Sequence, residues 1–331
     1  MPNERMRIGL IGQDGLPERW RTAVASVAHV APDPNIDTDL DALIVATAGP
    51  DAFARAKTAL DAGLPVLYAA SSLLSPWQTQ ALLSVAGRRG ALLRFAEPFQ
   101  HHAGFAFLRR LLTGDEPFWR TLYLRSTSLA PAGSGARLDE LASEQLAACD
   151  ALIDRPARRV SGAANRADEA GVRALFLTIE YEGGPLIHCT VSVAEPVSER
   201  RLVAVTQGRS IVLDWNDPDS SLCFQGAQEH VVHPPPATES SAPDPVLAEV
   251  TEFVAAARTG DRSIENGARW ARLAAIWWAA RESMSFGETV EVAGRRFLIQ
   301  NAEPPPLRVI EGGGRVVAPA RPRPVLTVVA G

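Results

Sequence analysis

The sequence contains little lysine and little cysteine. Lys57 is the only lysine among 33 basic residues. Arginine stays protonated at any working pH, so Lys57 is the only side chain that offers a titrating amine. The three cysteines, Cys149, Cys189 and Cys223, lie far apart and form no C-x-x-C pair. This spacing excludes a disulfide scaffold and the usual cysteine zinc sites, and we expect no bound metal ion.

The sequence also lacks a surplus of positive charge and any long hydrophobic run. The net charge is −5, with 33 basic against 38 acidic residues, whereas nucleic-acid binders carry an excess of lysine and arginine. No apolar run approaches the roughly 20 residues that span a bilayer. The first residues show no charged segment followed by an apolar leader. We therefore expect a cytoplasmic protein that binds neither nucleic acid nor membrane.

The first hundred or so residues alternate short apolar strands with helices. A length of 331 residues with 46% apolar side chains favours about two domains. Strands are expected over residues 7–11, 40–46, 65–68 and 91–95, and helices over 17–27, 51–62 and 76–87. This alternation predicts a Rossmann-like, doubly wound parallel sheet with helices on both faces.

From about residue 120 the pattern changes to strands of alternating apolarity. They are expected over residues 121–128, 173–181, 186–193, 201–205 and 210–215, followed by helices over 246–258 and 264–285. Such alternation is typical of an antiparallel sheet with one open face. We predict an α/β protein with a Rossmann-like dinucleotide-binding-type domain (1–119), a substrate and dimerisation α+β domain with a large, open, mainly antiparallel sheet (120–300), and a Pro/Gly-rich tail (301–331).

Several stretches together carry a resemblance to a known family. They are the strand over residues 6–12, the segments 39–47 and 59–67, and the helix and strand over 265–292. In order and spacing, the chain resembles the Gfo/Idh/MocA oxidoreductases, the family of glucose–fructose oxidoreductase and inositol dehydrogenase. This resemblance implies a bound NAD or NADP at the first domain.

The glycine-rich loop of that family is altered in this chain. Its G-x-G-x-x-G pattern falls on Gly12, Asp14 and Pro17, with Gly15 between. The second glycine normally lets the backbone approach the pyrophosphate, whereas Asp14 adds a side chain and a negative charge. Two interpretations stay open: the loop is a turn that binds no dinucleotide, or it binds one through Gly12 and Gly15.

Two further residues are candidates for the cofactor site. Asp33, about 20 residues beyond the loop, either binds a ribose hydroxyl or belongs to an ordinary loop between Pro32 and Pro34. Thr47 directly follows the strand predicted over residues 40–46. The predicted cofactor-binding residues are thus Gly12, Gly15, Asp33 and Thr47.

The catalytic motifs of the family are missing. Its Glu-Lys-Pro motif falls on Ala69, Ala70 and Ser71, and Lys57 cannot replace the lysine because it lies on the preceding predicted helix. The D-x-G-x-H-x-x-D motif aligns with Ser143, Gln145, Ala147 and Asp150, so that only the final carboxylate remains. Oxidation of an alcohol needs a base to accept the hydroxyl proton as hydride leaves, and both of the family's usual bases are absent.

His101 and His102 are the remaining candidate acids or bases. They follow the predicted strand 91–95, near the carboxyl end where ligands bind in such sheets. An imidazole there could act near neutral pH. Alternatively, the two histidines belong to a loop that begins a helix. With Asp150, they complete the predicted catalytic set.

Two functions follow from these observations. We favour a non-catalytic relative that serves as a binding module, or as a subunit that supports an active partner. The alternative is an NAD(P)-dependent oxidoreductase with reorganised chemistry, such as reduction of an imine or carbonyl. Fold alone does not decide between them, because one fold hosts many functions. In both cases we expect a small-molecule ligand.

The strand over residues 186–193 predicts self-association. Ile187, Cys189, Val191 and Val193 form its core side, while the opposite side carries Leu186, His188, Thr190 and Ser192. The second set has no formal charge and suits contact with another sheet. Relatives in the family commonly pair through this face. We predict a homodimer, or a heterodimer with an active relative, built through the second sheet; the alternative is a monomer with a mildly polar face.

Overall fold

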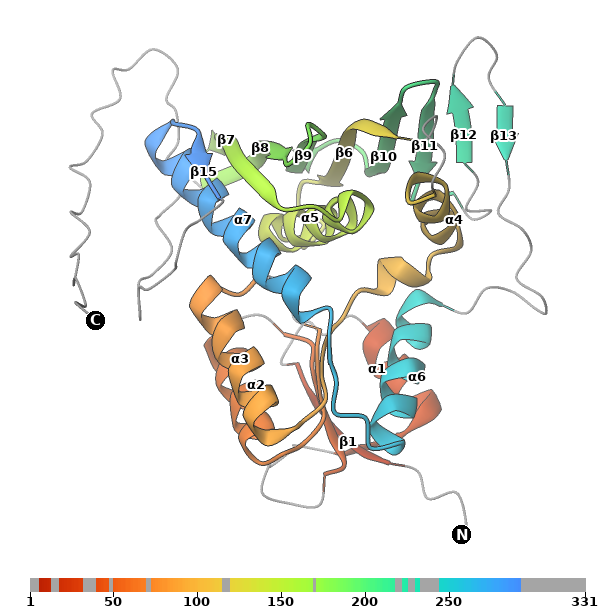
Figure 1. Ribbon diagram of the computed structural model, residues 1–331, viewed down its shortest axis with the longest axis vertical. Helices are drawn as coiled ribbons and strands as arrows, with labels where there is room; N and C mark the ends of the chain where they lie inside the picture. Colours follow the sequence, from red (N-terminus) through yellow and green to blue (C-terminus); the bar gives the residue numbers. More distant parts are fainter. Residues whose placement is uncertain are drawn as a thin grey trace.

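The structure is a computed structural model, and it forms two stacked domains (Figure 1). The lower domain contains a parallel sheet between two pairs of helices, and the upper domain is a broad sheet whose lower face is covered by helices. The structure describes residues 6–12, 18–31, 40–47, 50–69, 73–114, 120–168, 171–217, 222–225, 230–232 and 244–292.

The lower sheet has six strands in the order β14-β5-β4-β3-β1-β2, all paired in parallel. Its strands are β1 (Arg7–Ile11), β2 (His29–Ala31), β3 (Ala42–Val45), β4 (Val66–Tyr68), β5 (Leu93–Phe95) and β14 (Ile264–Glu265). Helices α1 (Glu18–Val27) and α6 (Pro245–Arg258) pack together on one face, and α2 (Pro50–Asp61) and α3 (Pro76–Arg89) on the other (Figure 1). The prediction of a doubly wound Rossmann-like sheet is confirmed.

Local sequence explains why these elements form. All four residues of β3 are buried, as expected for a strand covered by helices on both faces. Helix α3 begins with a capping box, in which the Ser75 hydroxyl accepts from the Gln78 backbone and the Gln78 side chain accepts from the Ser75 amide. It ends at Gly90, whose φ of 60° is the left-handed conformation that favours glycine.

The upper sheet has nine strands in the order β13-β12-β11-β10-β6-β9-β8-β7-β15. Only the β6–β9 pair is parallel. The strands are β6 (Thr121–Pro131), β7 (Ala157–Asp168), β8 (Gly171–Tyr181), β9 (Leu186–Glu195), β10 (Glu199–Thr206), β11 (Ser210–Asp214), β12 (Leu222–Gln225), β13 (His230–Val232) and β15 (Val290–Glu291). The predicted large, mainly antiparallel sheet is confirmed.

Four helical segments lie between the two sheets. The short 3-10 helix η1 (Pro98–His101) follows β5, and α4 (Ala103–Leu112) leads from it to the upper sheet. Helices α5 (Leu138–Ile153) and α7 (Gly267–Phe286) cover the lower face of that sheet and leave the upper face open (Figure 1). On β9, Ile187, Cys189 and Val191 are buried against the helices, as the alternation predicted, but the prediction was wrong at the end of the strand, where Ser192 is buried and Val193 is only half-buried.

Two segments of the predicted second domain lie with the lower sheet. Helix α6 packs against α1, and β14 pairs with β5 at the sheet edge. Both belong to the range 120–300 that the sequence assigned to the second domain. The chain therefore returns to the first domain before α7 enters the upper one. The predicted tail, 301–331, lies outside the described residues.

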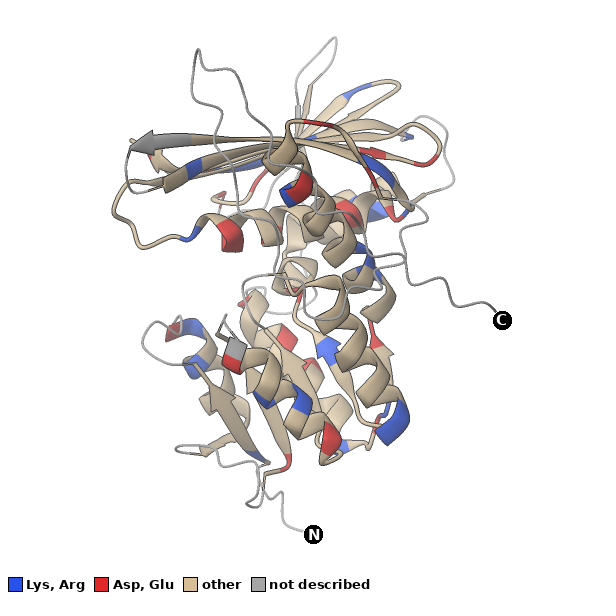
Figure 2. Cartoon of the chain, turned by 90° about the vertical axis from the view of Figure 1, so that its left-hand side faces the viewer, with Lys and Arg blue, Asp and Glu red and all other residues tan. Residues whose placement is uncertain are grey.

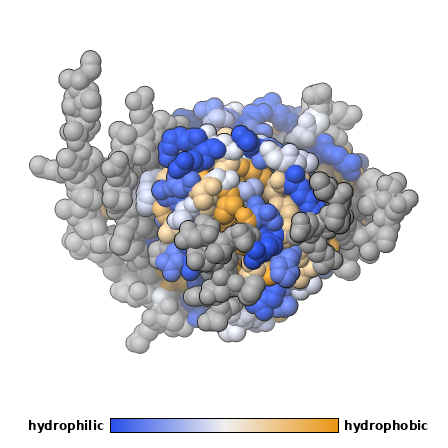
Figure 3. All heavy atoms as spheres, turned by 90° about the horizontal axis from the view of Figure 1, so that it is seen from below, coloured by the Kyte–Doolittle hydropathy of each residue, from blue (hydrophilic) through white to orange (hydrophobic). Residues whose placement is uncertain are grey.

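The surface carries charges of both signs. Figure 2 shows acidic and basic residues interspersed over both domains. Seen from below, the visible face of the lower domain mixes hydrophilic residues with apolar ones (Figure 3). Within the described ranges, no helix is long and apolar enough to cross a membrane.

Candidate functional site

The carboxyl ends of β1 and β3 lie side by side. The Ala46 amide donates to the Ile11 carbonyl at 2.9 Å, so Gly12 and Thr47 follow adjacent strand ends. In doubly wound sheets, ligands bind outside this edge. The structure thus brings two predicted cofactor residues together, while Gly15 and Asp33 lie outside the described residues.

The charge beside this edge does not favour a dinucleotide. Helix α1 starts with Glu18, an exposed carboxylate 3.8 Å from Arg21. In dinucleotide-binding folds the pyrophosphate meets the N-terminus of this helix. A carboxylate in the first turn places negative charge where phosphates would lie. The edge formed by β1 and β3 fits a nicotinamide dinucleotide, whereas the negative charge at the start of α1 opposes its binding.

Lys57 lies away from this edge, as predicted. Its Nζ is 2.7 Å from Asp61 Oδ2 on the same helix. Helix α2 begins just after the carboxyl end of β3, and Lys57 is about two turns along it, roughly 10 Å from its start. Ala69 directly follows β4, while Ala70 and Ser71 lie outside the described residues. The titrating amine therefore does not serve the carboxyl edge.

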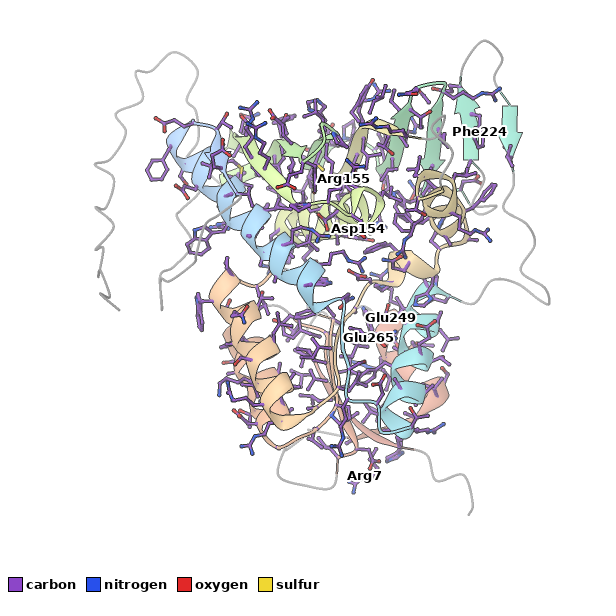
Figure 4. All side chains as sticks on the ribbon, viewed as in Figure 1. Arg7, Asp154, Arg155, Phe224, Glu249 and Glu265 are labelled. Carbon is purple, nitrogen blue, oxygen red and sulfur yellow. The ribbon has the colours of Figure 1, made fainter. Side chains whose placement is uncertain are left out.

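His101 is held against helix α6. Its Nε2 is 3.4 Å from Glu249 Oε2 and its Nδ1 is 3.8 Å from Glu252. Hydrogen bonding to Glu249 raises the pKa of the His101 imidazole, although burial opposes the shift. Arg94 on β5 also pairs with Glu249, Glu252 and Glu265, and Figure 4 shows Glu249 and Glu265 at the top of the lower domain. These contacts give His101 a role in joining η1 to α6.

His102 caps α4 and packs on the upper sheet. Its Nδ1 accepts from the Phe105 amide at 3.4 Å, and its ring meets Trp215 edge-on with centroids 5.1 Å apart. Burial lowers the pKa of His102, and the positive charge of Arg200 lowers it further. The two adjacent histidines therefore point to different neighbours.

Asp150 is fully buried between α5, α7 and the upper sheet. It accepts from the Tyr181 hydroxyl at 3.1 Å and from Arg272 Nη2 at 2.8 Å. Arg272 also reaches Asp154, which Figure 4 places at the end of α5. Burial raises the pKa of Asp150, and Arg272 opposes this shift. Asp150 thus ties α7 to the upper domain, with contacts distinct from those of His101 and His102.

Glu97, which sequence reasoning missed, joins the domains at the carboxyl end of β5. It is 3% exposed and accepts from Arg269 Nε at 3.0 Å and from Trp270 Nε1 at 2.9 Å, both on α7. The side-chain amide Nδ2 of Asn266 also donates to the Phe95 backbone carbonyl at 2.8 Å. Burial raises the pKa of Glu97, and Arg269 opposes the shift. These bonds fix the start of α7 on the lower sheet.

Helix α5 carries the aligned remnant of the second family motif. Ser143 Oγ accepts from the Leu73 amide at 3.1 Å, in the segment that follows the missing Glu-Lys-Pro motif. The Gln145 side chain instead turns to Ser126 on β6. Ala147 is buried in the core. Ser143 therefore links α5 to the segment after the Glu-Lys-Pro position, and its hydroxyl does not titrate near neutral pH.

Comparison with known proteins places the fold. No protein-family model and no curated protein sequence matches the chain. Among solved structures, UDP-N-acetylglucosamine 3-dehydrogenase from Acidithiobacillus ferrooxidans is similar with a TM-score of 0.71 and 19% identity, over 84% of this chain and 97% of the other. A 3-ketoreductase from Actinomadura kijaniata, in complex with TDP-benzene and NADP, has a TM-score of 0.69 and 16% identity, over 85% and 98%.

A third structure, an oxidoreductase from Agrobacterium radiobacter in complex with NAD+, L-tartaric acid and magnesium, has a TM-score of 0.70. It is 15% identical, over 87% of this chain and 98% of the other. These similarities define the class: the chain has the two-domain fold of the Gfo/Idh/MocA-type oxidoreductases.

Proposed function

We propose that this chain is a non-catalytic relative of the Gfo/Idh/MocA oxidoreductases, a binding module or a subunit that supports an active partner. One observation carries the proposal: each candidate base is already engaged in a structural contact. His101 is bound to α6, His102 caps α4, and Asp150 is paired with Arg272. The position of the family lysine is Ala70, and the only lysine is paired with Asp61.

The alternative is an NAD(P)-dependent oxidoreductase with reorganised chemistry. Structures of the same fold include a 3-dehydrogenase and a 3-ketoreductase, the latter with NADP. The paired strand ends at Gly12 and Thr47 favour this alternative, because they form the edge where such a cofactor lies. Glu18 weighs against it, since it adds negative charge in the first turn of α1; Asp14, which lies outside the described residues, adds a second negative charge to the loop sequence.

An activity assay separates the two functions. The protein is incubated with NAD or NADP and with inositol, glucose or UDP-N-acetylglucosamine, and reduction of the nicotinamide is followed by absorbance. We expect no turnover, because the candidate bases His101, His102 and Asp150 are each engaged in a structural contact and do not offer a free base for the hydroxyl proton. A dehydrogenase of the same fold serves as the positive control. Turnover of even roughly 1 per second, the low end for ordinary enzymes, would contradict the proposal.

We further propose that two chains pair through the open face of the upper sheet. A row of side chains crosses this face at Phe176, Thr190, Thr127 and Arg201, on four adjacent strands. Phe176 is 46% exposed, a large apolar side chain on an otherwise mixed face. Beside this row, Arg125, Val203 and Val212 line a hollow of about 640 Å³. Two-fold symmetry would bring each row against its own copy; whether the partner is a second copy or an active relative follows from the mass of the purified protein.

A further inference from the structure

Three polar side chains form a row across the lower face of the upper sheet. Ser128 on β6 pairs with Arg200 on β10. Trp215 directly follows β11, and its backbone amide donates to the Arg200 carbonyl at 2.9 Å. The row faces the helices, because Arg200 contacts Glu144 of α5 and Trp215 stacks on Phe105 of α4. The three side chains therefore lie next to one another on one face.

Each member of the row keeps a buried polar atom without a hydrogen-bond partner. Among the described residues, Ser128 Oγ, Arg200 Nε and Trp215 Nε1 find no acceptor or donor. All three groups can donate a hydrogen bond, and two of them can only donate. Buried polar groups are almost always paired, so three neighbouring exceptions need an explanation. Acceptor oxygens brought by another molecule would satisfy them.

The surroundings of the row suit a small ligand. Arg200 Nη2 lies 2.5 Å from Glu144 Oε1, whereas the neighbouring Nε–H of the same guanidinium has no partner among the described residues. The guanidinium lies 6.0 Å from the centre of the Trp215 ring, whose other neighbours are Phe105 and His102. The Arg200 side chain is 28% exposed, so the row is open to solvent at that residue.

The row also borders the interface between the two domains. His102, beside Trp215, directly follows η1 and hence the carboxyl end of β5. Ser143, the neighbour of Glu144 in the chain, accepts from the Leu73 amide in the segment after β4. In Figure 1, α4 and α5 lie between the two sheets. The row thus lies where α4 and α5 join the upper sheet, on its side toward the lower domain.

We propose that Arg200, Trp215 and Ser128 bind a planar oxygen acceptor, the carboxylate or carbonyl group of a small molecule. The Nε–H of Arg200, the indole N–H of Trp215 and the hydroxyl of Ser128 supply three donors to the oxygens of such a group. The proposal names the ligand class of the binding module and rests on that proposed function. Sequence reasoning did not single out any of the three residues.

The test follows the indole N–H of Trp215 directly. The full chain is labelled with ¹⁵N-tryptophan, and the Trp215→Phe variant identifies which indole signal belongs to Trp215. Sodium lactate and lactamide are the probes, one carrying a carboxylate and the other an uncharged carbonyl. We expect a saturable shift of the Trp215 signal. A shift with lactate alone assigns a carboxylate, and a shift with both assigns a carbonyl oxygen.

Two arginine variants give a matched comparison. Arg200→Gln should weaken binding roughly tenfold or more, because a hydrogen bond to a charged donor is lost. Arg89→Gln is the control, since Arg89 is an exposed residue in the last turn of α3, in the lower domain, and pairs with Asp61. If Arg200→Gln does not fold, Ser128→Ala replaces it, with weaker binding expected.

If neither lactate nor lactamide saturates the shift of the Trp215 signal below roughly 10 mM, the proposed ligand site is overturned. That result would indicate that water satisfies the three donors. Equal binding by Arg200→Gln and the parent protein would overturn it as well. These results are independent of the activity assay. Turnover with NAD(P) refutes the non-catalytic function and leaves the ligand site intact, whereas an unmoved Trp215 signal refutes the site alone.

Discussion

Replacing Asp150 by asparagine tests whether this carboxylate is a structural anchor. The Asp150 side chain is fully buried, and it accepts from Tyr181 and from Arg272. Removing one partner of a buried ion pair typically costs about 3–5 kcal/mol, because the other charge is left uncompensated. Arg272 is 23% exposed and keeps Asp154 as a partner, so we expect a loss near the lower end, about 3 kcal/mol.

The assay is urea unfolding, monitored by circular dichroism, with Asp154→Asn as the matched control. Asp154 pairs with the same Arg272 but is 75% exposed, and its φ of 45° is one that asparagine tolerates. The control should therefore lose less than about 1 kcal/mol of unfolding free energy. An equally small loss for Asp150→Asn would refute the assignment of Asp150 as an anchor and restore it as a candidate base.

Three further predictions concern pH, association and the altered loop. The bond to Glu249 raises the pKa of His101 above its usual 6.5. The stabilisation of the folded state by protonated His101 is therefore complete below about pH 6.5 and is lost as the pH rises through the raised pKa. His101→Gln should make the free energy of urea unfolding less dependent on pH over that range. Thr190→Arg should halve the mass measured by light scattering to the 35.4 kDa of one chain, whereas a monomeric parent protein would refute the dimer. Asp14→Gly should tighten NADH binding roughly ten- to a hundredfold, since it removes a like charge and a side chain; unchanged affinity in a folded variant would show that Asp14 is not the obstacle.

Strong periodicity in the sequence predicted most of the fold. The apolar strand 40–46 corresponds to β3, and the alternation over residues 186–193 corresponds to β9 with Ile187 and Val191 inside. The division into a parallel and a mainly antiparallel sheet followed from the change of pattern near residue 120. Helix 264–285 begins slightly later, at Gly267, because Ile264 and Glu265 pair with β5 as a short edge strand.

Strand β7 could not be predicted because its residues carry little strand signal. It is rich in alanine, arginine and polar residues, which do not favour strands. Tertiary packing forms it instead: it pairs along β8, and at Gly162 a Cβ would lie 2.9 Å from atoms of Leu177 and Met284. A close approach of α7 therefore requires glycine there, and such a contact is invisible in a single sequence.

The candidate ligand row was beyond sequence reasoning for a different reason. Ser128, Arg200 and Trp215 are far apart in the chain, and they become neighbours only through the register of β6, β10 and β11. Register depends on which strands pair, and the pairing of β6 with β10 and β9 crosses long stretches of chain. By contrast, the family motifs are contiguous, so the loss of the lysine at Ala70 was evident from the sequence.

Titration of the purified protein with NADH and NADPH tests the central claim most directly. Nicotinamide fluorescence is followed while the cofactor concentration rises to roughly 1 mM, the top of the usual range for enzyme substrates. A non-catalytic module with Asp14 in the altered loop sequence and Glu18 in the first turn of α1 predicts no saturable change with either cofactor. Tight, saturable binding of either one would contradict this account and favour the oxidoreductase.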